Sequence, residues 1–211
     1  MPSDEPKRRG RPPSGGREAI LAATLALLRE RGIARLTTRE VALRAGVAEA
    51  SVYYHYRDRA GLLRAVFEEG LRPLRALNER GIEGPDQLDV MARLARALER
   101  FLDQALPVLT AAQSDTELRD ELAEYMTAND LGPHRGVRAL GTYLRAEQQA
   151  GRIGPHIDPD AAALMLIGAC FMRAYQRQML GPHTRTLPSL ERVISTLDAM
   201  LAPKSTDQRH G

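Results

Sequence analysis

The amino-acid sequence predicts an all-α protein, with a small helical domain near the amino terminus and a larger helical domain after it. Apolar residues recur at spacings of three and four along most of the 211 residues, which is the period of helices with one buried face. No segment alternates apolar and polar residues as a half-buried strand does. We expect an arm at 1–16, a first domain at 17–63, a second at 64–203 and a tail at 204–211.

The arm, residues 1–16, is rich in proline, glycine and positive charge. It has too little apolar surface to form a core, so we expect it to be disordered. The first helix follows at 17–32. Ile20, Thr24, Leu27 and Leu28 share its inward face, and Gly32 ends it.

A short helix is predicted from Thr38 to about Ala45. Thr37 and Glu40 fit the reciprocal capping pattern, in which the threonine oxygen accepts from a free amide and the glutamate reaches back to the cap. The small side chains Val41, Ala42 and Ala45 would face inward. Gly46 supplies the left-handed residue that ends the helix.

A second short helix is predicted from Glu49 to about His55. Val52 and Tyr56 are one turn apart and would face the core. The polar side chains Ser51, Tyr53, Tyr54 and His55 would then be divided between the partner helix and the outside. A donor-rich helix set against another by a tight turn is suited to a DNA major groove.

Longer helices are predicted for the rest of the chain. Asp58 can cap one that runs from Arg59 toward Leu74, with Leu62, Leu63, Val66 and Phe67 inward. Another opens at Pro85 and Asp86 and runs to about Leu106, where Pro107 interrupts or closes it. Others begin at Ser114 or Asp115, and after residues 132–134 with an end near Gly151.

The last two predicted helices follow Asp158, Pro159 and Asp160, and Leu187, Pro188 and Ser189. The first of them is apolar on almost every face: Leu164, Met165, Leu166, Ile167, Ala169, Phe171 and Met172. One partner helix cannot cover all of these side chains. We expect residues 158–180 and 187–203 to pair with their own copies in a homodimer; the alternative is a monomer with a fully internal helix.

Composition argues against several other classes of protein. The five histidines form no metal-spaced pair, and neither a Gly-rich phosphate loop nor a nucleophile motif occurs, so we expect no enzyme, metal or cofactor. No apolar run is long enough to span a membrane, and we expect a cytoplasmic protein. The single cysteine, Cys170, excludes an internal disulfide. Residues 1–60 contain 12 Lys and Arg and 7 Asp and Glu, whereas residues 61–211 contain 18 Lys and Arg and 20 Asp and Glu. The positive charge is therefore concentrated in the amino-terminal part of the chain.

The stretch 37–63 resembles the DNA-binding domain of the TetR/AcrR family of bacterial transcriptional regulators. The family pattern is matched by Ala45, Gly46, Val47, Ser51, Val52, Tyr53, His55, Tyr56 and Arg59. Two positions depart from it. Ala48 replaces the usual serine cap, so the start of the second short helix should lack the stabilisation of a capping side chain, a loss of about 1 kcal/mol or less. Ala50 replaces a frequent glycine and could contact a thymine methyl group.

The resemblance implies roles for individual residues. Phosphate contacts would come from Ser51, Tyr53, His55 and Arg59, and from Thr37 or Thr38. Arg39 would reach a base edge, where arginine can bind guanine through two acceptors. Glu49, Ala50 and Tyr54 are the other candidates for reading bases. The alternative interpretation is that the aromatic residues are core and the charged residues an ordinary solvated surface.

The arm adds a second resemblance. Arg9, Gly10, Arg11 and Pro12 are similar to the AT-hook, an extended segment whose arginines lie in a narrow A·T minor groove. The alternative is a basic arm that only adds attraction to phosphates. In both cases the affinity for DNA should fall with added salt.

The family resemblance also implies a small-molecule effector site between the helices of the larger domain. Candidate lining residues are Met91, Leu94, Phe101, Tyr125, Met126, Phe171 and Tyr175, with Gln113, Asn129 and Gln178 as polar groups. The implied function is a dimeric repressor that an inducer releases from a palindromic operator in double-stranded DNA. Alternatives are an activator or an architectural DNA-binding protein that needs no ligand.

Overall fold

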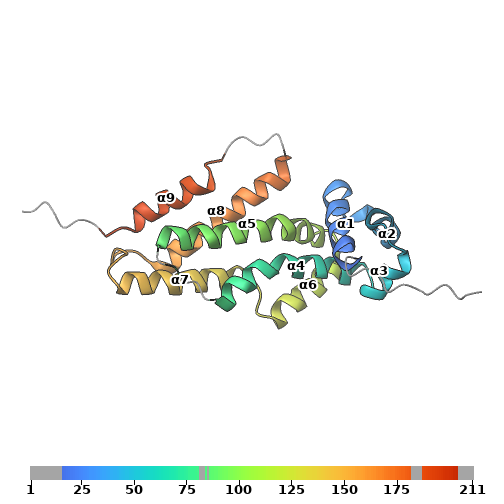
Figure 1. Cartoon of the computed structure of the whole chain (residues 1–211), viewed down its shortest axis with the longest axis horizontal. Helices are drawn as coiled ribbons and strands as arrows, with labels where there is room; N and C mark the ends of the chain where they lie inside the picture. Colours follow the sequence, from blue (N-terminus) through green and yellow to red (C-terminus); the bar gives the residue numbers. More distant parts are fainter. Residues whose placement is uncertain (1–15, 81–83, 85, 182–186, 204–211) are drawn as a thin grey trace, which may run out of the picture. The chain divides into compact units, whose positions relative to one another are not determined.

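The computed structural model describes residues 16–80, 84, 86–181 and 187–203 (Figure 1). Within these ranges the regular elements are all helices, as the sequence predicts. The arm with Arg9 and Arg11, Pro85 and the tail lie outside the described residues. The chain divides into two compact units between Val66 and Phe67.

The first unit contains α1 (Gly16–Arg31), the short 3-10 helix η1 (Ile33–Arg35), α2 (Thr38–Ala45), α3 (Glu49–His55) and the beginning of α4 (Arg59–Arg80). Helices α1, α2 and α3 contact one another. All four residues predicted to face inward from α1 are buried. The Thr24 hydroxyl donates a hydrogen bond to the Ile20 carbonyl over 2.7 Å. Because its hydrogen-bonding need is met in this way, the buried polar side chain costs little stability.

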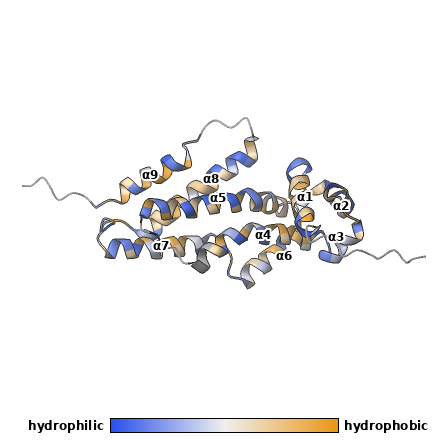
Figure 2. Cartoon of the chain, viewed as in Figure 1, coloured by the Kyte–Doolittle hydropathy of each residue, from blue (hydrophilic) through white to orange (hydrophobic). Residues whose placement is uncertain are grey.

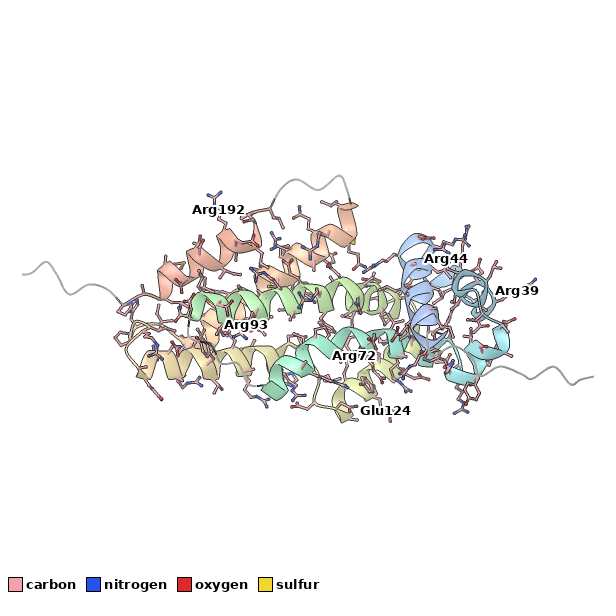
Figure 3. All side chains as sticks on the ribbon, viewed as in Figure 1. Arg39, Arg44, Arg72, Arg93, Glu124 and Arg192 are labelled. Carbon is pink, nitrogen blue, oxygen red and sulfur yellow. The ribbon has the colours of Figure 1, made fainter. Side chains whose placement is uncertain are left out.

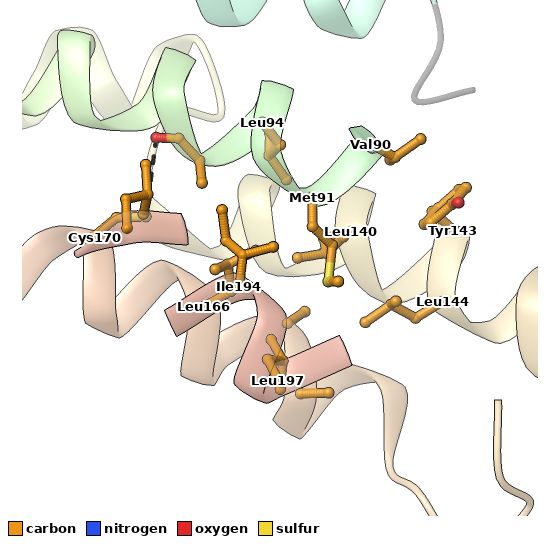
Figure 4. Packing of buried hydrophobic residues seen from close by; sticks show 14 of the residues in the cluster. Val90, Met91, Leu94, Leu140, Tyr143, Leu144, Leu166, Cys170, Ile194 and Leu197 are labelled. Carbon is orange, nitrogen blue, oxygen red and sulfur yellow. Dashed lines mark hydrogen bonds between the residues drawn. The ribbon is translucent and has the colours of Figure 1, made fainter. Parts of the chain in front are cut away.

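The second unit contains α5 (Gln87–Ala112), α6 (Thr116–Ala128), α7 (Pro133–Gln149), α8 (Pro159–Leu180) and α9 (Leu190–Leu201). Helix α5 contacts α6, α8 and α9, and α8 also contacts α7 and α9. Their shared core includes Met91, Leu140, Leu166 and Ile194 (Figure 4). Burial of this apolar surface is the main contribution to the stability of the unit.

Side-chain caps set the beginnings of these helices. Asp58 Oδ1 accepts from the Gly61 amide over 2.7 Å at the start of α4, and Asp115 accepts from the Leu118 amide at the start of α6. Asp158 and Ser189 do the same at α8 and α9. Each cap satisfies amides that have no partner within the helix. The predicted starts at these four residues are confirmed.

Two predicted helix ends are wrong. Helix α5 continues through Pro107 to Ala112, and α4 continues past Leu74, with Pro73 inside it, to Arg80. Proline removes one hydrogen bond and crowds the preceding turn, at a cost of about 3 kcal/mol. In α5 this cost is offset because Pro107, Val108, Ala111 and Ala112 are all buried, and stopping at Leu106 would leave these side chains without their core contacts.

Helix α8 has one buried face and one exposed apolar face. Ala163, Leu166 and Cys170 are buried. The opposite side carries exposed apolar residues, which we call the α8 stripe: Leu164, Met165, Phe171, Met172, Tyr175 and Met179. Figure 2 shows apolar residues along both α8 and α9. Among the described helices, none combines the length and the hydropathy needed to cross a bilayer.

A group of charged side chains joins α8 to α5 beside this stripe. Arg173 Nε lies 2.6 Å from Glu99 Oε1, and both side chains are largely buried. Arg177 contacts Glu99 and Asp103, and Arg173 also donates to the Pro188 carbonyl, just before α9. Charges removed from water in this way require partners, so the group fixes α8 against α5.

Candidate nucleic-acid interface

The two short helices of the first unit are joined by a tight turn. Thr37 Oγ1 accepts from the Glu40 amide over 3.2 Å and begins α2. Gly46 ends α2 with φ 68°, in the left-handed region, where a side chain is strained. The Val47 amide then donates to the Ala42 carbonyl over 3.0 Å. These bonds fix the direction in which α3 leaves the turn.

Buried residues anchor α3 on one side. Val52 and Tyr56 are buried, as are Val41 and Ala42 of α2. Ala45, which was predicted to face inward with them, is half-buried. Because Val52 and Tyr56 lie one turn apart, their burial determines which side of α3 faces away from the protein.

The other side of α3 carries exposed donor groups. Tyr53 is 55% exposed and Tyr54 84% exposed, and the Tyr54 and His55 rings make an edge contact with centroids 5.1 Å apart. Ser51 is half-buried. The phenol and imidazole groups on this face are therefore accessible from outside, which the alternative interpretation of them as core residues did not predict.

Residues at the ends of the neighbouring helices are also exposed. Thr37 and Arg39 at the start of α2, Glu49 and Ala50 at the start of α3, and Arg59 at the start of α4 are accessible, and Thr38 is half-buried. Figure 3 shows the Arg39 side chain extending away from α2. All ten candidate DNA-contacting residues of the first unit are at least partly exposed. Arg9 and Arg11 lie outside the described residues.

A hydrogen-bonded contact between α2 and α3 was not predicted. Thr38 Oγ1 lies 2.9 Å from Glu49 Oε1 and 3.1 Å from the Tyr53 phenol oxygen. The contact joins the first residue of α2 to the first residue of α3, eleven positions later. No local motif indicates such a bond, because its geometry depends on how the two helices pack.

Ion pairs hold α2 against α1. Arg44 makes two bonds to the Glu30 carboxylate, of 2.9 and 2.6 Å, and its hydrogen bonds lower the pKa of Glu30. Arg31 lies 2.9 Å from Glu40 Oε1, so the predicted reach of Glu40 back to its own cap is replaced by a bond to α1. The other oxygen of this carboxylate, Oε2, is buried without a hydrogen-bond partner.

The seven candidate effector-binding residues of the second unit lie in different settings. Met91 and Leu94 are buried in the core, with Phe101 packed against it. Tyr125 and Met126 on α6 are half-buried. Phe171 and Tyr175 belong to the exposed α8 stripe, where their rings stack with centroids 6.0 Å apart. The candidates on α5 and those on α8 therefore do not face the same surroundings.

Two of the three polar candidates make hydrogen bonds within the protein, and the third lies at the end of a helix. Gln178 Nε2 donates to Thr110 Oγ1 over 3.1 Å, and Asn129 Nδ2 donates to the Tyr125 carbonyl over 2.8 Å. Gln113 is exposed at the end of α5. Among the residues that the structure describes, no group of three or more His, Cys, Asp or Glu is placed to hold a metal ion.

Comparison with protein families finds two matches that together span most of the chain. Residues 20–66 match the family described as "Bacterial regulatory proteins, tetR family". Residues 89–202 match the "AefR-like transcriptional repressor, C-terminal domain". The first match contains the exposed face of α2 and α3, and the second covers α6 to α9 and nearly all of α5.

Individual proteins of known class are also similar to this chain. Helix-turn-helix (HTH) type transcriptional regulators from Mycobacterium tuberculosis and Mycobacterium bovis are 32% identical to it over 103 residues, which is 49% of this chain. The chain spans about half the length of these relatives, 51%. YdeS of Bacillus subtilis, also an HTH-type regulator, is 27% identical over 79% of this chain and 82% of its own.

Among solved structures, SmeT in complex with triclosan has the same fold, with a TM-score of 0.62 at 22% identity. The match covers 93% of this chain and 99% of that one. Members of the matched family bind DNA as dimers to regulate transcription and are not enzymes. With its second family match covering more than half of its length, this chain belongs to the TetR family of bacterial transcriptional regulators.

Proposed function

We propose that the protein is a repressor that binds a palindromic operator as a homodimer and is released by a small-molecule inducer. The observation that carries the proposal is the exposed donor face of α2 and α3, held in place by the buried Val52 and Tyr56. A helix presented in this way can enter the major groove, where base edges are distinguishable. The match to an AefR-like repressor domain favours repression over activation.

On this proposal the exposed residues have two kinds of role. Ser51, Tyr53, His55 and Arg59, with Thr37 or Thr38, bind phosphates and set the register of the protein on DNA. Arg39, which extends outward from α2 (Figure 3), reads guanine through its two acceptors. Glu49, Ala50 and Tyr54 are exposed on α3 as well and complete the base contacts.

Self-association is proposed through α8 and α9, residues 158–180 and 187–203. The α8 stripe leaves several large apolar side chains in contact with water, and contiguous apolar patches of this kind mark interaction surfaces. A two-fold dimer buries the same stripe of both copies against each other. The dimer also presents two copies of α3, the recognition helix proposed to enter the major groove, as a palindromic site requires.

An apolar effector is proposed to bind in the second unit, among Met91, Leu94, Phe101, Tyr125 and Met126. Phe171 and Tyr175 are set apart from this group because they form part of the α8 stripe. The triclosan complex of SmeT shows an apolar aromatic compound bound to a protein of the same fold. Methionine side chains adapt to varied apolar ligands, which suits such a site.

Release of DNA is proposed to follow from a shift between two conformations. An inducer shifts their populations only by its difference in affinity for the two states. Helix α4 begins in the first unit and continues into the second. Residues 59–74 are therefore the segment through which we propose that the effector site and the recognition helices are coupled.

Selection of bound fragments from random duplex DNA tests the proposal. A selected palindrome would support a dimeric repressor, and absence of binding to any duplex at low ionic strength would refute DNA binding. On the selected site, Tyr53→Phe and His55→Ala should weaken binding to all sequences, whereas Arg39→Ala should also relax the preference at one base pair. Apolar compounds that raise Tm should weaken operator binding; compounds that raise Tm without this effect would indicate a DNA-binding protein that needs no inducer.

A further inference from the structure

The contact among Thr38, Glu49 and Tyr53 has a defined direction. The Thr38 hydroxyl has one hydrogen, and an ionised carboxylate can only accept, so that hydrogen is donated to Glu49 Oε1 over 2.9 Å. The Tyr53 phenol, 3.1 Å from Thr38 Oγ1, must then supply its own hydrogen to the threonine oxygen. The sequence of donation runs from Tyr53 to Thr38 to Glu49.

The Glu49 carboxylate is held at a place where negative charge is costly for a DNA-binding protein. Glu49 is exposed, and among the ion pairs of the described residues no arginine or lysine pairs with it. The two arginines of the α1–α2 contact, Arg31 and Arg44, pair with Glu40 and Glu30 instead. The carboxylate lies in the first turn of α3, where the helix dipole favours negative charge. Because it is exposed beside the outward face of α3, it repels phosphates that approach it, so in a complex with DNA it needs a hydrogen-bond donor.

The chemistry of the major groove limits what that contact can be. The carboxylate accepts hydrogen bonds, and the amino groups of cytosine and adenine are the donors that bases offer there. Adenine places its N7 acceptor beside the amino group, and guanine and thymine present acceptor oxygens. A carboxylate oriented by its hydrogen bond from Thr38 therefore favours cytosine and is repelled by the acceptor atoms of the other bases.

From this geometry we propose that Glu49 reads a cytosine amino group in each half-site and that Thr38 is the positioning residue that orients the carboxylate. The inference rests on the proposed function, since it requires that this face meet the major groove. Tyr53 is free to turn its hydrogen to a phosphate when DNA binds, because Thr38 can keep its own bond to Glu49 without it.

Replacement of Glu49 tests the base contact. With a duplex selected from random DNA, we expect wild-type protein to prefer cytosine at one position of each half-site by about tenfold. In Glu49→Gln that preference should fall to about twofold or less, while binding to unselected duplex tightens because a negative charge has been removed. Glu124→Gln, which removes an exposed charge from α6 in the second unit (Figure 3), should change neither quantity appreciably.

Replacement of Thr38 tests the positioning role. Thr38→Val keeps the shape and removes the hydroxyl, so the cytosine preference should fall toward that of Glu49→Gln, whereas Thr38→Ser should retain it. Tyr53→Phe should lower affinity for all sequences and leave the cytosine preference intact. Circular dichroism and Tm identify any variant that fails to fold, and the Glu49→Gln result then stands on its own.

The two levels of the proposal fail differently. Protein that ignores every duplex refutes DNA binding itself. If the protein binds a selected site but Glu49→Gln leaves the base preference at every position unchanged, the proposed function stands and the role of Glu49 is refuted. Loss of an adenine preference in place of a cytosine preference overturns the assignment of the base, and equal cytosine preference in Thr38→Val and wild type overturns the role of Thr38.

Discussion

Leu164→Ala should weaken the proposed dimer about a hundredfold. The substitution removes three carbons, worth about 2.4 kcal/mol at about 0.8 kcal/mol for each buried methylene. Leu164 is 57% exposed in the single chain, so roughly that share, about 1.4 kcal/mol, is gained only when a second copy covers it. A two-fold interface contains the residue twice, which gives about 2.7 kcal/mol, equivalent to about two decades in the dissociation constant.

Fluorescence-detected sedimentation from nanomolar to micromolar protein measures this constant. Leu43→Ala is the matched control, because Leu43 is 83% exposed on α2 and loses the same three carbons outside the proposed interface. We expect Leu43→Ala to dimerise like the wild type. An unchanged dissociation constant in Leu164→Ala, or equal weakening in both variants, would refute the assignment of the interface to the α8 stripe.

Three further predictions concern the cap of α4, the cysteine and the arm. Asp58→Ala removes the acceptor of the Gly61 amide and should lower the free energy of unfolding by about 1 kcal/mol in urea titrations; no change would show that the cap contributes nothing. Burial raises the pKa of Cys170 from 9.0 to about 12, so iodoacetamide at pH 8 should label it only after unfolding, and fast labelling of folded protein would contradict this. Because the unfolded thiol ionises first, Cys170 should also make stability fall as pH rises from about 9 toward 12. Deletion of residues 1–14 should weaken DNA binding and flatten its salt dependence; an unchanged slope would exclude phosphate contacts by the arm.

Most helix beginnings were predictable because their causes are local. A capping side chain and the amides that it accepts from lie within three residues of each other, as at Asp115 and Leu118. The helix ends were harder to predict. Whether a helix stops at Pro107 depends on the burial of Val108, Ala111 and Ala112, and burial depends on how the helices pack rather than on the local sequence around the proline.

The surroundings of the effector candidates could not be predicted for a similar reason. Apolar periodicity identifies a stripe on a helix but does not say what covers it. Helix α8 has apolar residues on two opposite faces: Phe171 and Tyr175 are on the exposed face, and Leu166 and Cys170 are on the buried one. Only the packing of α8 against α5, α7 and α9 distinguishes the two faces.

At the beginning of α3, the local sequence and a tertiary contact both determine the structure. Ala48 has no capping oxygen, and the structure confirms that no side chain caps this helix. The bond from Thr38 to Glu49 ties the first turn of α3 to α2 and provides a tertiary constraint in place of the local one. A serine at position 48 would add the cap without removing the bond from Thr38, so Ala48→Ser should raise the free energy of unfolding by up to about 1 kcal/mol. If it lowers stability instead, a capped start of α3 is incompatible with the position from which Glu49 accepts the hydrogen bond of Thr38.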